Sequence, residues 1–338
     1  MKKIVITLAV LGAAAGAAQA QSTVVIYGAL DSYVETGRNG QSTMTRVQNG
    51  GAAPSRIGFR GVEDLGGGTK AIFSLETGIN VDDGTAAQGG LLFGRQAYVG
   101  LSGNFGTITA GRQYTPFFMT NLLYTLGGGM GWGNAANYFL EPPSARANNA
   151  LQYATPNING FVFKAMYALG ENPAPGAGKV GNVRAVSGQY DSGKLSLNVS
   201  HMNRTTTEAN ADKWSALGAS YDFTVVKTAL VYQVRRDDAN LARNDYFDLS
   251  ATIPMGAAVL LLDVGALKNK VTSDADAATA SIRYDYFVSK RTTVYGGYSV
   301  VRNQAKARFG VTGAGGAPMV AVAGADPRAL AIGVRHFF

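Results

Sequence analysis

The sequence predicts an all-β fold, a 16-stranded antiparallel transmembrane β-barrel, and three observations carry this prediction. Segments of about ten residues alternate between apolar and polar side chains, which is the period of a β-strand. Short turns alternate with long polar or glycine-rich loops, which is the layout of barrels that cross an outer membrane. No helical period of useful length appears in the 338 residues, which include 44 glycines, 16 tyrosines and 15 phenylalanines but only 15% charged residues.

The N-terminus predicts export. Lys2 and Lys3 precede an apolar run, and small residues then end in Ala18-Gln19-Ala20, which is the pattern of a secretory signal peptide with cleavage after Ala20. The apolar run is too short for a membrane anchor. We therefore expect residues 1–20 to be removed and residues 21–338 to form a single barrel domain. Of the net charge of +8, Lys2 and Lys3 supply two, which leaves +6 on the mature chain.

The first strands show how the faces are assigned. From Thr23 to Glu35 the even positions carry Val24, Ile26, Leu30 and Val34, whereas the odd positions carry Tyr27, Asp31, Tyr33 and Glu35. The next segment places Arg56 and Arg60 on the face opposite Ile57 and Phe59. The same alternation predicts sixteen strands: Thr23–Glu35, Ser55–Arg60, Ala71–Gly78, Leu91–Leu101, Thr107–Gln113, Ala147–Tyr153, Phe161–Leu169, Asn182–Tyr190, Lys194–Arg204, Lys213–Phe223, Val225–Arg236, Asp245–Ile253, Ala258–Asn269, Ala277–Phe287, Arg291–Arg302 and Arg328–Phe338.

Longer loops are predicted at Gly37–Ala52, Glu171–Gly181, Thr205–Asp212 and Asn303–Pro327. Aromatic residues gather at strand ends, as the interfacial girdles of a membrane barrel require; these are Tyr221/Phe223, Tyr246/Phe247, Tyr284/Tyr286/Phe287 and Phe337/Phe338. A large soluble β-sandwich or β-helix with aromatic core residues is the alternative. Ten-residue strands in an even number, after an export signal, favour the membrane.

One connection, at about residues 114–146, differs from all others. No charged residue occurs between Arg112 and Glu141, yet Pro116 and a cluster of glycines interrupt any helical period. Long loops of this kind in a compact domain are usually either functional or disordered. Because it is too apolar for a solvated tail, we expect this segment to fold against the inside of the barrel.

Catalysis, metal binding and nucleic-acid binding find no support in the sequence. The two histidines, His201 and His336, are far apart and have no ligands at metal spacing. No nucleophile motif or phosphate-binding loop occurs in a strand–helix context. Lysines and arginines are dispersed singly and form no basic tract. We therefore expect no enzyme, no cofactor and no nucleic-acid partner.

Several segments together resemble the general diffusion porins of the Gram-negative outer membrane, of the betaproteobacterial and neisserial type. They are Val25–Asp31, Ser55–Gly68, Gly94–Leu101 with Gly111-Arg112-Gln113, Arg146 with Asn149–Tyr153, and Gly333–Phe338. The resemblance implies short periplasmic turns, long extracellular loops, a third loop folded into the lumen, and a homotrimer in outer-membrane lipid. It also implies a constriction between that loop and the facing wall, with arginines at Arg56, Arg95 and Arg146 and a carboxylate at Glu76.

This sequence departs from the enteric version of the family. The Pro-Glu-Phe-Gly-Gly motif of the third loop is replaced by Gly127–Trp132, and Glu141 is the only acid of that loop. A basic residue often found on the first strand is replaced by Ala29. We therefore expect the arginines to be poorly balanced by acids.

Alternation places Arg56 and Arg146 on the inward face, whereas solvated surface arginines with local partners are the alternative for each. Fixed charges along a narrow aqueous pore select ions by sign, and a guanidinium stays charged at any physiological pH. The first strand adds Asp31 and Glu35 on its inward face. Further lumen candidates are Arg60, Lys164, Arg184, Arg235 and Arg302.

The sequence thus predicts a passive channel for small hydrophilic solutes and inorganic ions, with a preference for anions. A substrate-specific porin is the nearest alternative, since an aromatic slide would use Tyr114, Phe117, Phe118, Tyr124 and Trp132. A barrel that only anchors an adhesin or an enzyme is a more distant alternative, because the loops are modest and no catalytic constellation is visible.

Overall fold

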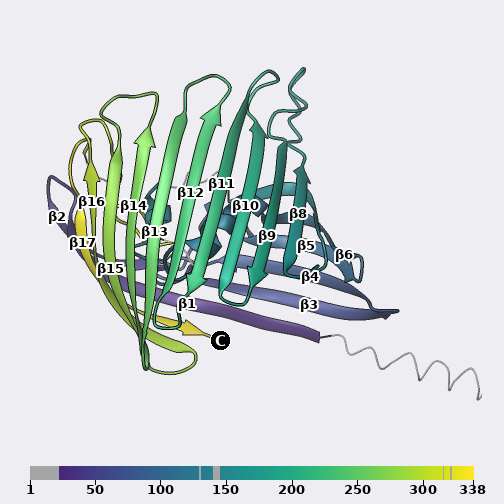
Figure 1. Ribbon diagram of the computed structural model, residues 1–338, viewed down its shortest axis with the longest axis horizontal. Helices are drawn as coiled ribbons and strands as arrows, with labels where there is room; N and C mark the ends of the chain where they lie inside the picture. The colour runs from purple at the N-terminus through teal and green to yellow at the C-terminus, as the bar shows by residue number, and fades with distance from the viewer. Residues whose placement is uncertain (1–22, 129–130, 140–144, 315, 320–321) are drawn as a thin grey trace, which may run out of the picture.

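The computed structural model describes residues 23–128, 131–139, 145–314, 316–319 and 322–338 (Figure 1). The predicted signal peptide and Glu141 lie outside the described residues. The strands are β1 (Thr23–Arg38), β2 (Thr43–Asn49), β3 (Arg56–Gly66), β4 (Thr69–Gly78), β5 (Gln96–Gly103), β6 (Gly106–Tyr114), β7 (Arg146–Ala154), β8 (Phe161–Ala168), β9 (Val183–Ser192), β10 (Leu195–Thr205), β11 (Ala211–Asp222), β12 (Lys227–Asp237), β13 (Arg243–Met255), β14 (Ala258–Asn269), β15 (Ala277–Phe287), β16 (Thr292–Asn303) and β17 (Arg328–Phe337).

These strands form one closed antiparallel sheet. From β3 onward each strand pairs with the next in sequence, and β17 returns to pair with β1 over ten residues. The seventeen segments fill sixteen positions, because β2 and β3 share one edge of β1. The pairing of β2 covers Ser32–Arg38 of that edge, and the pairing of β3 covers Thr23–Ala29. The predicted sixteen-stranded barrel is confirmed, whereas the expectation of a plain loop at Gly37–Ala52 was wrong.

The burial pattern explains why the sheet closes in a membrane. Side chains along β15 alternate strictly, with buried residues inside and exposed Ile282, Tyr284 and Tyr286 outside. Similar outward rows recur around the barrel, and Val99 and Ile332 are more than 60% exposed. Monomeric soluble proteins rarely leave such large apolar surfaces uncovered. A band of this kind is stable when lipid surrounds it.

Short helices occupy the connections rather than the wall: α2 (Ala87–Gly90), α3 (Pro116–Tyr124), the 3₁₀ turn η2 (Leu126–Gly128) and α4 (Ala135–Phe139). Among the described residues, no helix has the length and apolarity needed to cross a membrane.

The expectation that Pro116 excludes a helix from the third loop was wrong. Proline is well tolerated in the first turn of a helix, where its missing N–H is not needed. In α3 it occupies that turn, and the hydroxyl of Thr115 accepts a hydrogen bond from the backbone N–H of Phe118 at 3.1 Å.

A second correction concerns the predicted strand Leu91–Leu101, which begins only at Gln96. The pairing of β4 with β5 ends at Glu76 and Gln96, and before it only the backbone N–H of Arg95 bonds to β4, at the carbonyl of Glu76, so residues 91–94 lie outside the ladder.

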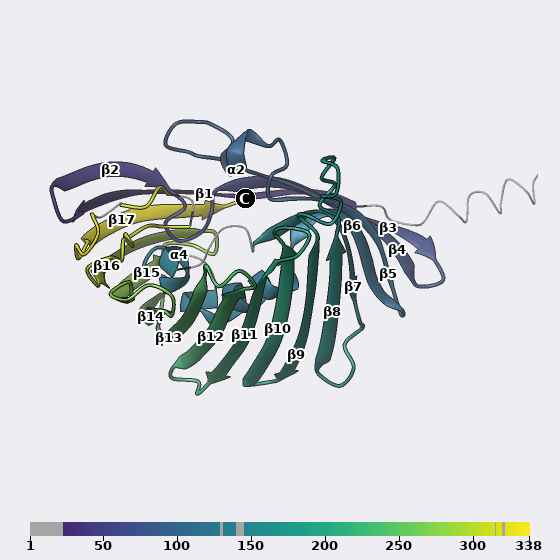
Figure 2. The same cartoon turned by 90° about the horizontal axis from the view of Figure 1, so that it is seen from above.

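Loops fill a large part of the barrel interior (Figure 2). Phe117 of α3 packs against an inner wall of small and apolar residues from β7 to β11, including Met202 and Trp214. Trp132 and the residues of α4 pack with Tyr295 and with the long connection between β16 and β17. That connection, predicted as an ordinary extracellular loop, also folds inward and buries Val311 and Met319. The wall of β3 to β6 and the start of β7 carries the arginines described next.

Candidate functional site

Four arginines project from one wall of the barrel interior. Arg56 and Arg60 lie on the inward face of β3, because Arg56 is opposite Ala29 of β1 and the outward positions hold Ile57 and Phe59. Arg95 directly precedes β5, and Arg146 is the first residue of β7. The register places Glu76 of β4 between β3 and β5, where it is opposite Gly58 and Gln96.

Glu76 is the centre of the cluster. Its carboxylate accepts a hydrogen bond from Arg95 Nε at 2.6 Å and another from the hydroxyl of Tyr27 at 3.0 Å. Arg56 Nε lies 3.5 Å from the same carboxylate. Arg95 and Glu76 are both buried, so this ion pair is shielded from water and screened less by salt than a surface pair. One carboxylate thus holds two guanidinium groups in place.

Tyr114, the last residue of β6, links the remaining arginine to the third loop. Its hydroxyl accepts hydrogen bonds from Arg95 and Arg146, each at 2.7 Å. The Arg146 guanidinium carbon also lies 4.4 Å from the centroid of the Tyr114 ring. That ring also stacks on Phe118 of α3, with 5.2 Å between the ring centroids. The start of the loop therefore fixes the position of two arginines.

Positive charge exceeds negative charge in this cluster. Arg60 is exposed and lies over the ring of Tyr27, with 5.3 Å between the guanidinium carbon and the ring centroid. Arg146 Nε is buried and has no hydrogen-bond partner among the described residues. The described part of the loop, residues 115–128 and 131–139, contains no charged side chain. Four guanidinium groups are thus balanced by a single carboxylate in the described part of the chain.

Hydrogen bonds attach the third loop to β1, to the segment before β3, and to β14 and β15. Trp132 Nε1 donates to Glu35 at 2.7 Å, and Arg283 donates to the backbone carbonyl of Trp132 at 2.9 Å. The backbone N–H of Ala135 donates to Asp263 at 3.0 Å. The Trp132 backbone N–H also donates to the carbonyl of Gly51. These bonds hold the loop across the lumen.

Two tyrosines and a threonine add further attachments. The hydroxyl groups of Tyr138 and Ser299 lie 2.9 Å apart. Burial raises the pKa of Tyr138, so its hydroxyl stays protonated throughout the physiological range. Thr120 bonds to Asn198 and Ser200, and Tyr124 to Ser196.

Asp31 and Glu35 face inward as expected, but they do not line an open lumen. Asp31 accepts hydrogen bonds from three consecutive backbone N–H groups, residues 51–53, and from the hydroxyl of Tyr295. Glu35 is paired with Arg46 at 2.6 Å and with Trp132. Both carboxylates therefore anchor loops.

The predicted basic track along the lumen is only partly correct. Lys164 alternates with the outward-facing Phe163 and Ala165, and Arg235 lies over the buried ring of Trp214 and 3.3 Å from Asp212. The expectation that Arg184 lines the lumen was wrong, because Arg184 is opposite the exposed Tyr167 and lies on the outer face. Arg302 is also on the outer face, with 79% of its side chain exposed.

The structure also removes the basis for an aromatic slide. Phe117, Phe118, Tyr124 and Trp132 are all buried in contacts between the loop and the wall. Among the proposed slide residues, Tyr114 is the one that contacts Arg95 and Arg146. No cluster of metal-binding side chains occurs in the described part of the chain.

Sequence reasoning missed two groups of residues that build this site. Tyr27 was placed on the inward face but was not connected to Glu76. Arg283 and Asp263 were not singled out, although alternation along β15 and β14 gives their inward direction: Arg283 lies between the outward residues Ile282 and Tyr284. Alternation could not predict that the third loop would contact Arg283 and Asp263.

Comparison with known proteins agrees with this architecture. The family model described as Gram-negative porin matches residues 7–306. Outer membrane porin protein 32 of Delftia acidovorans is 36% identical over the full length of both chains, and a major outer membrane protein P.IB of Neisseria meningitidis serogroup B is 28% identical over 87% of this chain and 91% of its own. The solved structure titled anion-selective porin from Comamonas acidovorans has a TM-score of 0.85 and 30% identity, and covers 94% of this chain and 100% of its own.

A closed sixteen-position barrel, an apolar outer band and a loop across the lumen all agree with these matches. The chain belongs to the Gram-negative porin family and forms a passive diffusion channel across the outer membrane.

Proposed function

We propose that this porin prefers anions, and that Arg56, Arg95 and Arg146 set the preference with help from Arg60. The observation that carries the proposal is the charge of this wall. Glu76 pairs with Arg56 and Arg95, the guanidinium groups of Arg60 and Arg146 contact the neighbouring Tyr27 and Tyr114, and the described part of the facing loop is uncharged. The similar solved structure, an anion-selective porin from Comamonas acidovorans, supports the same assignment.

The physical basis is the field inside a narrow aqueous pore. Low-dielectric walls concentrate the field of fixed charges, so the local concentration of anions rises and that of cations falls. Guanidinium groups suit this role because they remain charged and are weakly hydrated. Glu76 offsets one positive charge but leaves an excess of three within the cluster.

Reversal potentials in planar bilayers test the proposal. Under a potassium chloride gradient, the wild-type channel should show a potential of the sign expected for chloride. The variants Arg56→Gln and Arg146→Gln should each reduce it, and the double variant should reduce it further. Arg291→Gln, which removes an exposed charge at the β15–β16 turn, is the matched control. Cation preference in the wild-type channel at low salt would refute the proposal.

We also propose that the protein assembles as a homotrimer through the wall formed by β1 and β3 to β6. Val24 and Val99 on that wall are more than 60% exposed, and each is opposite a small residue, Gly61 and Ala110 respectively. An outer membrane protein of Vibrio cholerae with the same fold is described as a trimer form. Native mass spectrometry in mild detergent should give three barrels per complex, and Val99→Arg should give monomers. A wild-type protein that is monomeric under these conditions would contradict the assembly.

A further inference from the structure

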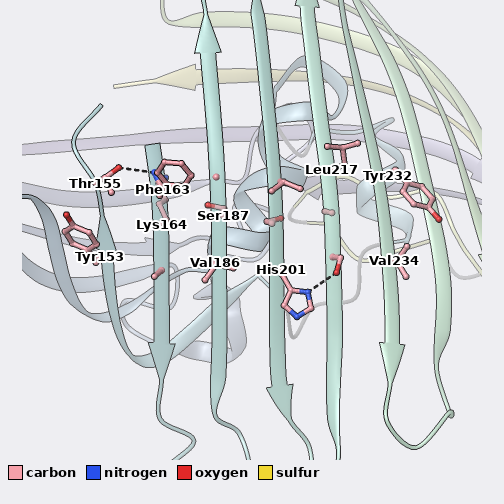
Figure 3. A pocket seen from close by; sticks show the side chains of 16 residues that line it. Tyr153, Thr155, Phe163, Lys164, Val186, Ser187, His201, Leu217, Tyr232 and Val234 are labelled. Atoms are coloured by element: carbon pink, nitrogen blue, oxygen red, sulfur yellow. Dashed lines mark hydrogen bonds between the residues drawn. The ribbon is translucent and has the colours of Figure 1, made fainter. Parts of the chain in front are cut away.

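A groove on the outer wall lies away from the constriction. It crosses β7 to β12 and has a volume of about 710 Å³. Figure 3 shows the lining side chains on neighbouring strands, with Phe163, Val186, Leu217 and Tyr232 among them. These residues are 43–52% exposed, so the groove opens toward the surrounding lipid. Channel function makes no use of it.

A row of cations runs along one side of this groove. The register pairs Arg184 with Asn203, Asn203 with Lys213, Lys213 with Arg236, and Arg236 with Arg243. The row therefore carries four positive side chains across five adjacent strands, all on the outer face. It lies two residues nearer the long extracellular loops than the groove residues of the same strands.

The acids near this row neutralise only part of it. Lys213 is paired with Asp238 at 2.5 Å, and Arg236 lies 3.8 Å from Asp245. Arg184 and Arg243 are exposed and have no ion pair within the described part of the chain. Arg184 instead lies 5.8 Å from the centroid of the Tyr167 ring, a contact that leaves its N–H groups available.

A smaller polar hollow, of about 260 Å³, adjoins the row at its extracellular side. Arg184 and Asn203 line it, together with Lys179 and Asn210 from the loops. Glu208 is the hollow's other acid besides Asp238, and it accepts a hydrogen bond from the backbone N–H of Lys179 at 3.0 Å.

The polar hollow and the apolar groove are adjacent on the same strands. Arg184 is two residues from Val186 on β9, and Asn203 is two residues from His201 on β10. His201 connects the two regions, because its ring lies 2.8 Å from the Ser215 hydroxyl and 2.9 Å from the Asn203 side-chain oxygen. A cationic hollow above an apolar groove matches a molecule with an anionic head and a hydrocarbon tail.

We propose that this surface binds a phosphate-bearing lipid of the outer leaflet. The phosphate would contact Arg184 and the neighbouring cations, and an acyl chain would lie in the groove. Arginine suits phosphate because its planar guanidinium can donate two parallel hydrogen bonds. Long basic side chains at the edge of a membrane place their charge at the level of lipid headgroups. A neutral lipid, or a second barrel with an apolar wall, would gain nothing from the row of cations.

Native mass spectrometry of the detergent-purified protein tests the proposal with three probes: bisphosphorylated lipid A, the same lipid without its phosphates, and inorganic phosphate. We expect bisphosphorylated lipid A to bind at least ten times more tightly than its dephosphorylated form, and inorganic phosphate at equal concentration not to displace it. Equal binding of both lipids, displacement by inorganic phosphate, or occupation of this wall by a second barrel would overturn the proposal.

Two variants separate the contribution of the lipid phosphate from that of the acyl chain. Arg184→Gln/Arg243→Gln should lower affinity for bisphosphorylated lipid A at least tenfold, whereas Lys290→Gln/Arg291→Gln, which removes two exposed cations from the periplasmic turn, should not change it. Ala165→Trp, which fills the groove, should weaken binding of both lipids. Heat-resistant migration on gels and unchanged conductance establish that each barrel is folded. Unaltered lipid A binding by both test variants would count decisively against this site.

Discussion

At the scale of single residues, the four arginines of the proposed constriction are not equivalent. Arg95 is buried and bonds to both Glu76 and Tyr114, so it connects β4 to the end of β6. Arg146 contacts only the ring and hydroxyl of Tyr114 among the interactions found in the described residues. Arg95 is therefore a structural element of the wall as well as a source of positive charge, whereas Arg146 contributes mainly charge.

This difference predicts different costs of substitution. Arg95→Gln leaves the Glu76 carboxylate buried with less compensation, and removing one partner of a buried ion pair costs roughly 3–5 kcal/mol. Arg146→Gln removes a cation–π contact and one hydrogen bond, which we expect to cost about 1–2 kcal/mol. Thermal unfolding of the two purified variants shows which substitution lowers the stability more. A larger loss of stability in Arg146→Gln than in Arg95→Gln would contradict this account.

The matched control for that experiment is Glu76→Gln in the Arg95→Gln background. Once the carboxylate is neutral, the loss of Arg95 should cost much less, because no buried charge is left without its partner. The wild type, Arg95→Gln, Glu76→Gln and the double variant form a double-mutant cycle. Because the two side chains are in contact, their coupling energy should be at least about 1 kcal/mol.

Alternation predicted the directions of Arg56, Arg60 and Glu76 but failed for Arg184, and the reason is physical. The usual pattern of a porin wall has polar residues inside. On β9 and β10 the inward positions are Val183, Ala185 and Met202, because α3 packs against them. The inner face there is a protein core, so polarity no longer separates inside from outside. The fold of the loop was needed before these strands could be oriented.

At the scale of elements, the third loop contains helices that are too short to be stable alone, and hydrogen bonds to the barrel wall hold it in place. Its helix α3 has nine residues, fewer than an isolated helix needs for stability in water. Its conformation therefore depends on contacts with the wall, and Trp132 supplies three of them through its indole and its backbone. The helix start at Pro116 and the strand β2 were not recognised in the sequence, although both have local partners: Thr115 caps α3, and β2 forms a hairpin with the end of β1.

The Trp132 indole gives a test of this attachment. Trp132→Phe removes the donor to Glu35, and hydrogen bonds to charged groups contribute roughly 1.5–3 kcal/mol. We expect lower thermal stability and greater open-channel current noise, since the loop would sample more positions across the lumen.

Trp214→Phe is the control, because Trp214 is an equally buried indole that packs under Phe117 by ring contact at 6.4 Å. Noise that rises as much in Trp214→Phe as in Trp132→Phe would show that general packing, rather than the bond to Glu35, holds the loop.

At the scale of the whole molecule, a barrel is stable only if its last strand pairs with its first strand. The seam between β1 and β17 joins ten residue pairs. Beyond β17, Phe338 exchanges two backbone hydrogen bonds of 3.2 Å with Gly28. The Phe338 ring lies so close to Gly28 that any side chain on that residue would collide with it. Glycine is therefore required at this position for close approach rather than for a special backbone angle.

Deletion of Phe338 should lower the yield of folded barrel, because it removes two backbone bonds at the seam and the ring that covers Gly28. Phe338→Ala keeps the backbone bonds and loses only the ring, so it separates the two contributions. If the backbone bonds dominate, the alanine variant should fold nearly as well as the wild type, whereas the deletion should not. Heat-modifiable migration of membrane fractions measures the folded yield, and a deletion variant with unchanged yield would show that the seam closes without its terminal residue.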